Sequence, residues 1–496
     1  MPVVQWVGQS LQDDDNQQSN TSRLLNLYRE RHGDKYILKS VLGTSILVDL
    51  PSVFIRAMEE IEGELYAVNG GKLYRIDGGT GPTRQFAELG GEWYEVQSGG
   101  INPGGGGIMP VDPDDTTCRV SGFVDAVEIG TISDAADTTM AGNNGAITIA
   151  AGGEYYNVAS DGTVTTPLTG AFDNVGSVDF IGQRTVITEK NGRRFGWSDV
   201  ADSTSFDGLD FASAESRDDD IIRGMAIGPQ YWIFGERSIE RWYLTGSGES
   251  TTFLQPVSGA DVDFGLKAFG LVSKFPNGAF FVGTNNKVLL ISGGSMKPVS
   301  TRGVETSITQ GRPQSCFYYQ DEAHEFCVIQ FKDRPAWVYD LVSNEWHERA
   351  EGIEFGPWSA SVSAKHNGVF FVGTASGQIR RLERSNKEAD GPLWRRAISS
   401  TLENDGKRFT VSRVQMQVAT GIVDVSGRAP EIMFRMSKDR ARTWGRERWR
   451  DTGVKGDYDK LVTLNALGQY RRATLEATMT DKAEIPLEST AFIEVA

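Results

Sequence analysis

The side chains in this sequence that could bind a metal ion or act in acid–base catalysis are few and scattered. The four histidines are His32, His324, His347 and His366, and none has a second histidine or a cysteine at metal-ligand spacing. A zinc site would therefore have to be assembled from distant segments of the chain. We expect no metal site, no cofactor-binding site and no catalytic residues.

The acidic and glycine-rich clusters do not match known ligand loops. The Asp-Asp-Asp triplets at 13–15 and 218–220 lack the spacing and the glycine of a calcium loop, so we interpret them as acidic turns in solvent. The glycine run at 104–107 is not followed by Gly-Lys-Ser/Thr, and no serine lies in a Gly-x-Ser-x-Gly elbow. A glycosidase needs two carboxylates at a set separation, which the 66 acidic residues neither show nor exclude. The chain is therefore expected not to be an enzyme.

The sharpest local motif runs from Ser437 to Trp444. Its sequence, Ser-Lys-Asp-Arg-Ala-Arg-Thr-Trp, fits the Asp-box pattern Ser-x-Asp-x-Gly-x-Thr-Trp, with Ala441 where glycine is usual. We expect the carboxylate of Asp439 to accept backbone N–H bonds and fix a hairpin turn, with Trp444 packed beneath it. Asp boxes occur in sialidases and other glycosidases, but the box itself lies away from catalysis. The motif therefore predicts a structural turn.

Three cysteines, an odd number, argue against a disulfide framework and indicate synthesis in a reducing cytoplasm. If Asp321 and Glu322 form a two-residue hairpin turn, Cys316 and Cys327 face each other across the hairpin. In that register they could in principle oxidise. We expect instead a pair of reduced thiols in the core.

An internal repeat predicts the elements that must position these residues. Gly-Ala-Phe-Phe-Val-Gly-Thr at 278–284 reappears as Gly-Val-Phe-Phe-Val-Gly-Thr at 368–374, and a third apolar run lies midway at 326–331. A unit of about 45 residues is the length of one four-stranded propeller blade. Each run is short, aromatic and β-branched and is followed by a turn and a second strand, which is typical of antiparallel hairpins.

The same pattern extends towards the N-terminus, with further runs near Tyr231, Arg184, Ile147 and Leu65. Asn-Gly turns within it are a strong hairpin signal. The step from Leu65 to Ile147 is about twice the usual spacing, so either one blade is degenerate there or a long loop intrudes. We predict six blades, with seven as the alternative.

The predicted fold class is all-β, a β-propeller with a C-terminal β-sandwich platform domain. Residues 1–50 contain N-terminal strands that are candidates to join the platform, and residues 51–388 form the propeller. A glycine- and proline-rich loop near 99–115 is expected to project from one face. Beyond Pro392 the repeat stops and strands with alternating apolar residues follow, so 389–496 is predicted to be the sandwich.

The charge of the chain is strongly uneven. The formal net charge is −16, from 66 acidic and 50 basic residues, which argues against binding nucleic acid over the whole surface. Residues 391–450 are the exception, with 13 basic and 6 acidic residues. We interpret this basic stretch either as a surface that docks to an acidic protein neighbour or as an exposed surface without a binding role. The sequence has no run of eighteen apolar residues and no signal-peptide pattern, so we expect no membrane insertion.

Three segments of the sequence match, in the same order, segments of the proteins of one known family. They are Asn-Thr-Ser-Arg-Leu-Leu-Asn-Leu-Tyr-Arg-Glu at 20–30, the phrase at 228–243 followed by Gly265 and Gly270, and Phe-Arg-Met-Ser-Lys-Asp-Arg at 434–440. In these segments, and across most of its length, the chain resembles the packaged-DNA stabilisation proteins of short-tailed, podovirus-type bacteriophages. These are also called tail nozzle or tail hub proteins. Every matching motif is a turn or a strand, and none is an active site.

The resemblance implies a viral structural protein, made in the cytoplasm of the bacterial host and located in the virion tail. It implies a homohexameric ring that extends the tail tube below the portal and adaptor, retains packaged DNA and serves as a platform for needle or tailspike proteins. The expected partners are the chain itself, an adaptor protein above it, and needle, plug, tailspike or fibre proteins around or below it. DNA is expected to pass through the lumen during ejection without sequence-specific binding.

The alternative is a propeller glycosidase or carbohydrate-binding protein, suggested by the Asp box and by 11 tryptophans. Stacking on sugars needs aromatic side chains exposed on one face. Trp197, Trp242, Trp337 and Trp358 instead recur at strand ends in blade-like positions. That periodicity favours packing between blades over a sugar-binding face.

Overall fold

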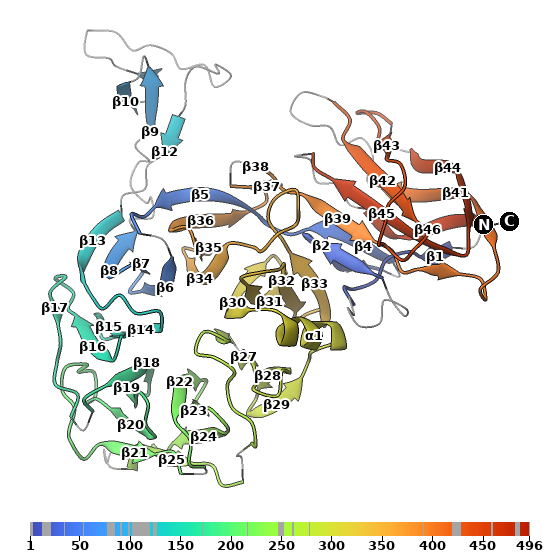
Figure 1. The fold of residues 1–496 in the computed structure, drawn as a ribbon. Coiled ribbons are helices and arrows are strands. Elements are labelled where there is room, and N and C mark those ends of the chain that lie inside the picture. Colours follow the sequence, from blue (N-terminus) through green and yellow to red (C-terminus); the bar gives the residue numbers. More distant parts are fainter. Residues whose placement is uncertain are drawn as a thin grey trace.

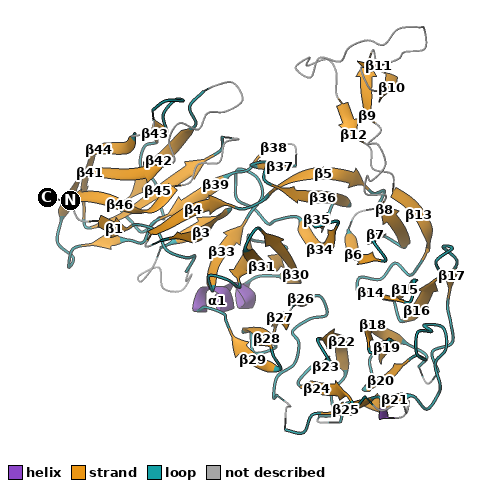
Figure 2. Cartoon of the chain, turned by 180° about the vertical axis from the view of Figure 1, so that it is seen from behind, coloured by secondary structure: helices purple, strands orange, loops and turns teal. Residues whose placement is uncertain are grey.

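The chain folds into a ring of small antiparallel sheets with a two-sheet body attached at one side (Figure 1). The structure is a computed structural model that describes residues 3–11, 21–33, 35–52, 54–76, 126–170, 172–215, 217–246, 252–259, 262–276, 278–389, 391–418, 428–457, 460–481 and 487–495, together with strand residues at 85–89, 92–97, 100–101 and 120–122. Seen from behind, strands form nearly all of both parts (Figure 2). The structure is therefore all-β, as predicted.

Five units of the ring are separate four-stranded sheets. In order around the ring, their strands are β6 (Ile55–Ile61), β7 (Glu64–Asn69), β8 (Lys72–Ile76) and β13 (Ala126–Thr131); β14 (Thr138–Asn143), β15 (Ala146–Ala151), β16 (Glu154–Val158) and β17 (Val164–Thr165); β18 (Val175–Ile181), β19 (Arg184–Glu189), β20 (Arg194–Trp197) and β21 (Phe211–Ser213); β22 (Ile221–Ile227), β23 (Gln230–Gly235), β24 (Ile239–Leu244) and β25 (Leu254–Pro256); and β26 (Val272–Phe275), β27 (Gly278–Val282), β28 (Val288–Ser292) and β29 (Ser295–Pro298).

Two further four-stranded units belong to larger sheets. The first consists of β30 (Pro313–Asp321), β31 (His324–Phe331), β32 (Ala336–Asp340) and β33 (Glu345–Arg349). The second consists of β34 (Ala360–His366), β35 (Val369–Thr374), β36 (Gln378–Glu383) and β5 (Gly43–Asp49). Since β5 pairs antiparallel with β36, a strand from near the start of the chain completes the last unit and closes the ring.

The sheets therefore give seven units, which matches the alternative and not the prediction of six. The unit around Leu65 is complete because β13 supplies its fourth strand. Between β8 and β13 the chain forms a separate sheet, and this insertion explains the doubled step in the repeat. Its strands are β9 (Gln85–Leu89), β10 (Glu92–Gln97), β11 (Gly100–Ile101) and β12 (Val120–Gly122). Apart from β11, the glycine- and proline-rich loop near 99–115 lies outside the described residues.

Tight turns hold successive strands of the ring together. Several turns between the first and second strand of a unit have positive φ at both central residues, which is the type I′ geometry that matches strand twist. Glycine and asparagine adopt this conformation readily, and these turns are Glu62-Gly63, Asn144-Gly145, Gly182-Gln183 and Asn367-Gly368. Two of these four turns are Asn-Gly, whereas the Asn-Gly pairs at 69–70 and 191–192 have positive φ at one residue only.

The body beside the ring is a sandwich of two sheets built from both ends of the chain. One sheet contains β1 (Val3–Gln5), β3 (Leu27–His32), β4 (Lys35–Ser40), β46 (Leu487–Val495), β41 (Phe409–Val418) and β44 (Leu461–Tyr470). The other contains β2 (Arg23–Leu25), β39 (Arg395–Ile398), β45 (Arg472–Met479), β42 (Glu431–Ser437), β43 (Arg448–Asp451) and β40 (Leu402–Glu403). The short strands β37 (Lys387–Glu388) and β38 (Gly391–Pro392) lie between the ring and the sandwich in sequence.

Charged side chains fix the sandwich to the ring. Arg23 donates two hydrogen bonds, of 2.8 and 2.6 Å, to the carboxylate of Glu348 on β33. On the ring, Arg384 lies 2.8 Å from Asp321, and the hydroxyl of Tyr28 on β3 is 3.3 Å from the same carboxylate. The second sandwich sheet also continues into the ring, because β2 pairs with β33.

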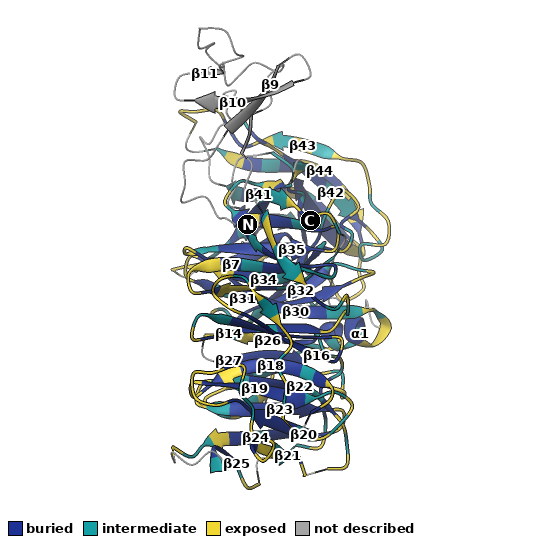
Figure 3. Ribbon diagram, turned by 90° about the vertical axis from the view of Figure 1, so that its left-hand side faces the viewer, coloured by how far each residue is buried: buried dark blue, intermediate teal, exposed yellow. Residues whose placement is uncertain are grey.

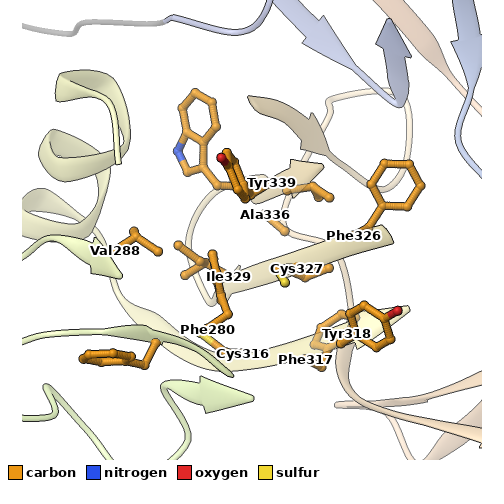
Figure 4. Close-up of a cluster of buried hydrophobic side chains, with 14 of the residues drawn as sticks. Phe280, Val288, Cys316, Phe317, Tyr318, Phe326, Cys327, Ile329, Ala336 and Tyr339 are labelled. Atoms are coloured by element: carbon orange, nitrogen blue, oxygen red, sulfur yellow. The ribbon is translucent and has the colours of Figure 1, made fainter. Parts of the chain in front are cut away.

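The cores of the two parts are separate apolar clusters. The largest ring cluster is centred on β27 and β31, where Phe280, Phe326 and Ile329 are fully buried (Figure 4). The sandwich cluster lies between its two sheets and includes Trp6 and Phe434. Buried residues form the stacked sheets and exposed residues collect at turns (Figure 3).

The tryptophans recurring at strand ends belong to these cores. Trp197, Trp242, Trp337 and Trp358 are all buried, so the prediction that they pack inside the ring is confirmed. The described residues contain one α-helix, α1 (Arg302–Gln310), capped by Thr301. No helix in the described part of the chain is long and apolar enough to cross a membrane.

Candidate interaction site on the sandwich

The Asp box forms a hairpin turn fixed by its carboxylate. Oδ1 of Asp439 accepts hydrogen bonds from the backbone N–H groups of Arg442 and Thr443 at 3.1 and 2.8 Å, and Oδ2 accepts one from the Thr443 hydroxyl at 2.6 Å. Hydrogen bonds from Thr443 lower the pKa of Asp439 to about 2. Ser437 Oγ accepts from the backbone N–H of Ala441 at 3.0 Å. The predicted turn, fixed by the Asp439 carboxylate, is confirmed; Trp444, expected beneath it, is half-buried.

A pocket of about 330 Å³ opens beside this turn. Its walls combine apolar and cationic side chains, a combination suited to an apolar group that carries negative charge. The lining residues are Met436, Lys438, Thr443, Trp444, Gly445, Arg446, Arg448, Leu467 and Tyr470. We call this feature the sandwich pocket.

The aromatic walls of the sandwich pocket are held in place by cations and hydrogen bonds. The guanidinium of Arg435 lies 5.5 Å from the Trp444 ring centroid, and Nζ of Lys438 lies 5.5 Å from that of Tyr470. The Tyr470 hydroxyl donates to the carbonyl oxygen of Leu467 at 2.6 Å. The pocket is thus built from three strands, β42, β43 and β44, and from the turn that follows β42.

Charge at the pocket is not neutralised by nearby carboxylates. Within the described residues no carboxylate forms an ion pair with Lys438 or Arg446, and both are exposed. Arg448 donates to the carbonyl oxygens of Asn465 and Ala466 at 2.8 and 3.0 Å and bridges the edges of the two sheets. Burial lowers the pKa of Arg448, and the neighbouring charges of Arg446 and Arg450 act in the same direction. The site therefore attracts anions.

In the described part of the basic stretch at 391–450, five other cations lie within ion-pair distance of a carboxylate, among them Arg396 and Arg413. Arg435 lies 2.6 Å from Glu476, Arg440 lies 2.9 Å from Glu403, and Arg428 lies 3.1 Å from Asp481. These pairs hold the sandwich together. Three cations of the stretch, Lys438, Arg446 and Arg448, line the pocket, while others such as Lys407 and Arg408 are exposed outside its lining.

A second group of charges lies in the centre of the ring. Glu59 on β6, Asp179 on β18, Arg223 on β22 and Lys274 on β26 come from four different units. Nζ of Lys274 lies 2.5 Å from Oδ2 of Asp179. The Glu59 side chain is open to solvent, yet enclosure by the ring raises its pKa to about 7; Asp179 acts in the same direction, while Lys274 and Arg223 oppose it. This carboxyl can exchange a proton near neutral pH.

The histidines serve separate local roles. Nδ1 of His324 lies 2.8 Å from Oδ2 of Asp340, and this hydrogen bond raises the pKa of His324. His347 is buried, which lowers its pKa to about 3, and His366 lies 3.2 Å from Glu60. His32 is exposed at the end of β3. Among the described residues, no group of three His, Cys, Asp or Glu side chains could hold a metal ion.

The two cysteines of the β30–β31 hairpin are not opposite each other. Asp321 pairs with His324, so the turn consists of Glu322 and Ala323, and Cys327 lies opposite Tyr318. The expected turn at 321–322 was wrong by one residue because Glu322 takes the left-handed conformation, with φ of 52°. Both thiols are free and buried, and burial raises the pKa of each (Figure 4).

The acidic triplet at 218–220 is only partly a solvent-exposed turn. Asp218 and Asp220 are exposed, but Oδ2 of Asp219 accepts hydrogen bonds from the backbone N–H groups of Arg237 and Ser238 at 2.6 and 3.1 Å. Asp219 therefore fixes the segment that enters β22 to the turn between β23 and β24 of the same unit, which the sequence interpretation missed. The triplet at 13–15 lies outside the described residues.

The sequence pattern indicated the sandwich site only in outline. The charge count drew attention to 391–450, and the Asp box located the turn beside Trp444. Leu467 and Tyr470, which also line the pocket, lie on β44, and no local sequence motif assigned this strand to the site. The central group around Glu59 was missed, although its members lie on the first strands of ring units and the repeat could have aligned them.

Both parts of the chain are similar to domains of one phage protein. A family model described as the β-propeller of bacteriophage P22 Gp10 matches residues 116–386. A second, described as the β-sandwich of bacteriophage P22 Gp10, matches residues 395–489. The first match covers more than half of the chain, and the order of the two domains is the same as in the structure. No curated protein matches the chain as a whole.

Solved structures similar to this chain share little sequence with it. BamB from Moraxella catarrhalis has 9% identity and a TM-score of 0.38, over 77% of this chain and 98% of that chain. PorZ of Porphyromonas gingivalis has 10% identity and a TM-score of 0.39, over 75% of this chain and 44% of that chain. The WD40 β-propeller domain of Doa1 has 8% identity and a TM-score of 0.39, over 69% of this chain and 96% of that chain.

Proposed function

The chain belongs to the phage stabilisation family of bacteriophage P22 Gp10, and from that premise we propose that its copies form a closed ring, a homohexamer, in the phage tail. Membership of this family makes the chain a structural protein of the virion tail that stabilises packaged DNA. The ring extends the tail tube below the portal and adaptor as a nozzle. The observation that carries the proposal is the match of propeller and sandwich to the same family in the same order.

The charge distribution supports a conduit for DNA. A net charge of −16 disfavours adhesion of phosphates, so DNA can pass through an acidic lumen during ejection without sequence-specific binding. The basic side chains that line the sandwich pocket are available to meet a protein neighbour. In this proposal the sandwich is the platform for assembly and the propeller is the outer part.

The proposed partners follow from a position at the end of the tail. The ring contacts an adaptor protein above it and needle, plug, tailspike or fibre proteins around or below it. A ring of identical subunits needs a heterologous interface repeated by rotation, with different surfaces on the two sides of each subunit. Within each subunit, the propeller and the sandwich provide two such different surfaces.

Particles assembled without this protein test the proposal. We expect heads that package DNA but lose it, measured as DNA that nuclease digests without prior disruption of the particles. Particles assembled with the protein should keep their DNA protected and show a ring at the tail end by electron microscopy. Particles that lack the protein yet keep both their DNA and a complete tail would contradict the nozzle assignment.

A further inference from the structure

One edge of the ring combines exposed apolar side chains with negative charge. In the unit β18–β21, Leu209 and Val200 are 76% and 54% exposed, and Leu168 in the preceding loop is 91% exposed. Residues 199–210 contain four aspartates and no lysine or arginine. Single exposed leucines are common, but a group rimmed by like charges marks an interaction surface. We call the loops at 166–170 and 199–209 the acidic rim.

The loops of the acidic rim are held in defined shapes. Asp207 Oδ1 accepts the backbone N–H of Leu209 at 2.8 Å, which fixes the turn that presents the leucine. A Cβ added at Gly170 would come within 3.1 Å of the carbonyl oxygen of Asp207, so the two loops are in contact. The leucine at 209 therefore stands out from the surface next to the carboxylate of Asp207.

The acidic rim and the sandwich pocket lie at opposite ends of the molecule. Strands β20, β21 and β25 are at one end and β42, β43 and β44 are at or near the other in all three overall views (Figures 1, 2 and 3). The rim offers a projecting leucine beside a carboxylate. The pocket offers an apolar floor of Met436 and Leu467 with exposed cations at its margin. The two surfaces are complementary in charge, and each has an apolar part.

We infer that the sandwich pocket of one copy binds the acidic rim of a second copy, with Leu209 in the pocket and Asp207 facing Arg446 and Lys438. This inference rests on the proposed ring, because it names the surfaces through which its subunits meet. Surfaces at opposite ends of one molecule form a head-to-tail contact, which closes into a ring when each step also turns. Charge pairs at the margin set the register of the contact and its rate of formation.

Cysteine cross-linking in assembled particles tests the contact directly. The double variant Leu209→Cys with Arg446→Cys should give a ladder of covalent oligomers on a non-reducing gel after mild oxidation. Each single variant should give none, since the described native cysteines are buried. Val342→Cys with Arg446→Cys is the matched control, because Val342 is an exposed apolar residue like Leu209, at 54% against 76%, but lies on a different unit.

Charge exchange gives an independent result. Arg446→Glu and Asp207→Lys should each reduce incorporation into particles at least tenfold, and the two changes together should restore part of it, since Asp207→Lys also removes the hydrogen bond that fixes the turn at Leu209. Val342→Ser should have no effect. If the single variants merely misfolded, the double variant would not restore incorporation. The circular dichroism of each single variant should also match that of the unchanged chain.

The outcomes separate this inference from the proposed function. If imaging shows a ring at the tail but the double cysteine variant enters particles without forming a ladder, the inference is wrong and the ring stands. If Arg446→Cys alone cross-links to a different tail protein, the pocket binds that protein and the inference is also wrong. If imaging shows no ring of subunits at the tail, the proposed function is wrong, and the inference that rests on it is wrong as well.

Discussion

At the scale of single residues, the Asp box shows how a departure from a sequence pattern is accommodated. Arg440 and Ala441 both have positive φ, of 61° and 64°, in a region that favours glycine. The hydrogen bonds that Asp439 and Ser437 accept hold this turn despite its backbone strain. The alanine that replaces the usual glycine is therefore a local weakness.

We predict that Ala441→Gly stabilises the sandwich by about 1 kcal/mol, because glycine adopts the left-handed conformation without the Cβ clash. Thermal unfolding of the purified protein should show a higher melting temperature for the sandwich. The control is Ala477→Gly in the centre of β45, which should lower it by loss of a buried side chain and greater backbone freedom. An unchanged melting temperature for Ala441→Gly would show that the hydrogen bonds fully absorb the strain.

Glu59 gives a prediction about pH. Its pKa is about 7 in the folded chain against an ordinary value of 4.5, so the charged form is penalised by folding. That penalty is absent below about pH 4.5 and fully present above about pH 7. Glu59→Gln should therefore raise the melting temperature at pH 8 and leave it unchanged at pH 4. Because water reaches this carboxyl, we expect a rise of only about 1–2 °C.

A matched control and a contrary outcome complete this test. Glu62→Gln, an exposed residue in the turn after β6, should show no dependence on pH. Equal shifts for Glu59→Gln at pH 4 and pH 8 would mean that the effect comes from packing and not from the proton.

The residues that sequence analysis located correctly are those whose neighbours are local in the chain. Asp439 and Thr443 are four positions apart, so a motif could predict their hydrogen bond. Glu59 and Lys274 meet only after the ring has closed. The pocket likewise needed β44 to bring Tyr470 beside Trp444, and such contacts leave no mark in a short pattern.

At the scale of elements, the strand that closes the ring is the one least expected from the sequence. The 45-residue repeat predicted hairpins, and hairpins pair neighbouring strands. β5 instead comes from residues before the first repeat and pairs with β36 at the other end of the ring. The unit count failed for a related reason, because the inserted sheet at β9–β12 separates β13 from the strands that it joins.

A substitution at Gly43 should weaken this closure. A Cβ at this position would clash with the backbone of Lys387, which cannot move away easily because β37 pairs with β5. We predict that Gly43→Val destabilises the ring by about 1–3 kcal/mol through overpacking. Guanidinium unfolding followed by tryptophan fluorescence measures the change.

Gly391→Ala is the control for the closure experiment. At that position the nearest atom to an added Cβ is the carbonyl oxygen of Glu388 at 3.6 Å, an ordinary contact. It should leave stability unchanged within about 0.5 kcal/mol. If Gly43→Val is equally mild, the closing strand contributes less to the ring than its pairing suggests.

At the scale of the whole molecule, the sandwich depends on both ends of the chain. β1 and β4 pair with β46, and β2 pairs with β39. The sequence predicts strands in residues 1–50 that are candidates to join the platform; β1 to β4 do join it, whereas β5 joins the ring. A truncation that removes the sandwich must therefore remove both its N-terminal and its C-terminal strands.

We predict that residues 41–388 alone form a soluble, folded ring, because this fragment keeps β5 and all the other ring strands. A fragment of residues 1–388 should aggregate, because β1, β3 and β4 then have unpaired edges and an uncovered apolar face. Size-exclusion chromatography and circular dichroism distinguish the two. Aggregation of the 41–388 fragment would show that the ring needs the sandwich to fold.

Because the sandwich contains both the first and the last strands of the chain, the order of synthesis determines when it can be completed. Each ring unit except the first, which needs β13, and the last, which needs β5, is built from strands that are close in sequence, so it can fold soon after it leaves the ribosome. β1, β3 and β4 are synthesised first but must wait for β41 and β46, which are synthesised after the whole ring. The sandwich, and with it the pocket for the next copy, is therefore completed last. A nascent chain cannot recruit neighbours through this pocket until its own ring has been translated, which keeps unfinished chains out of the tail.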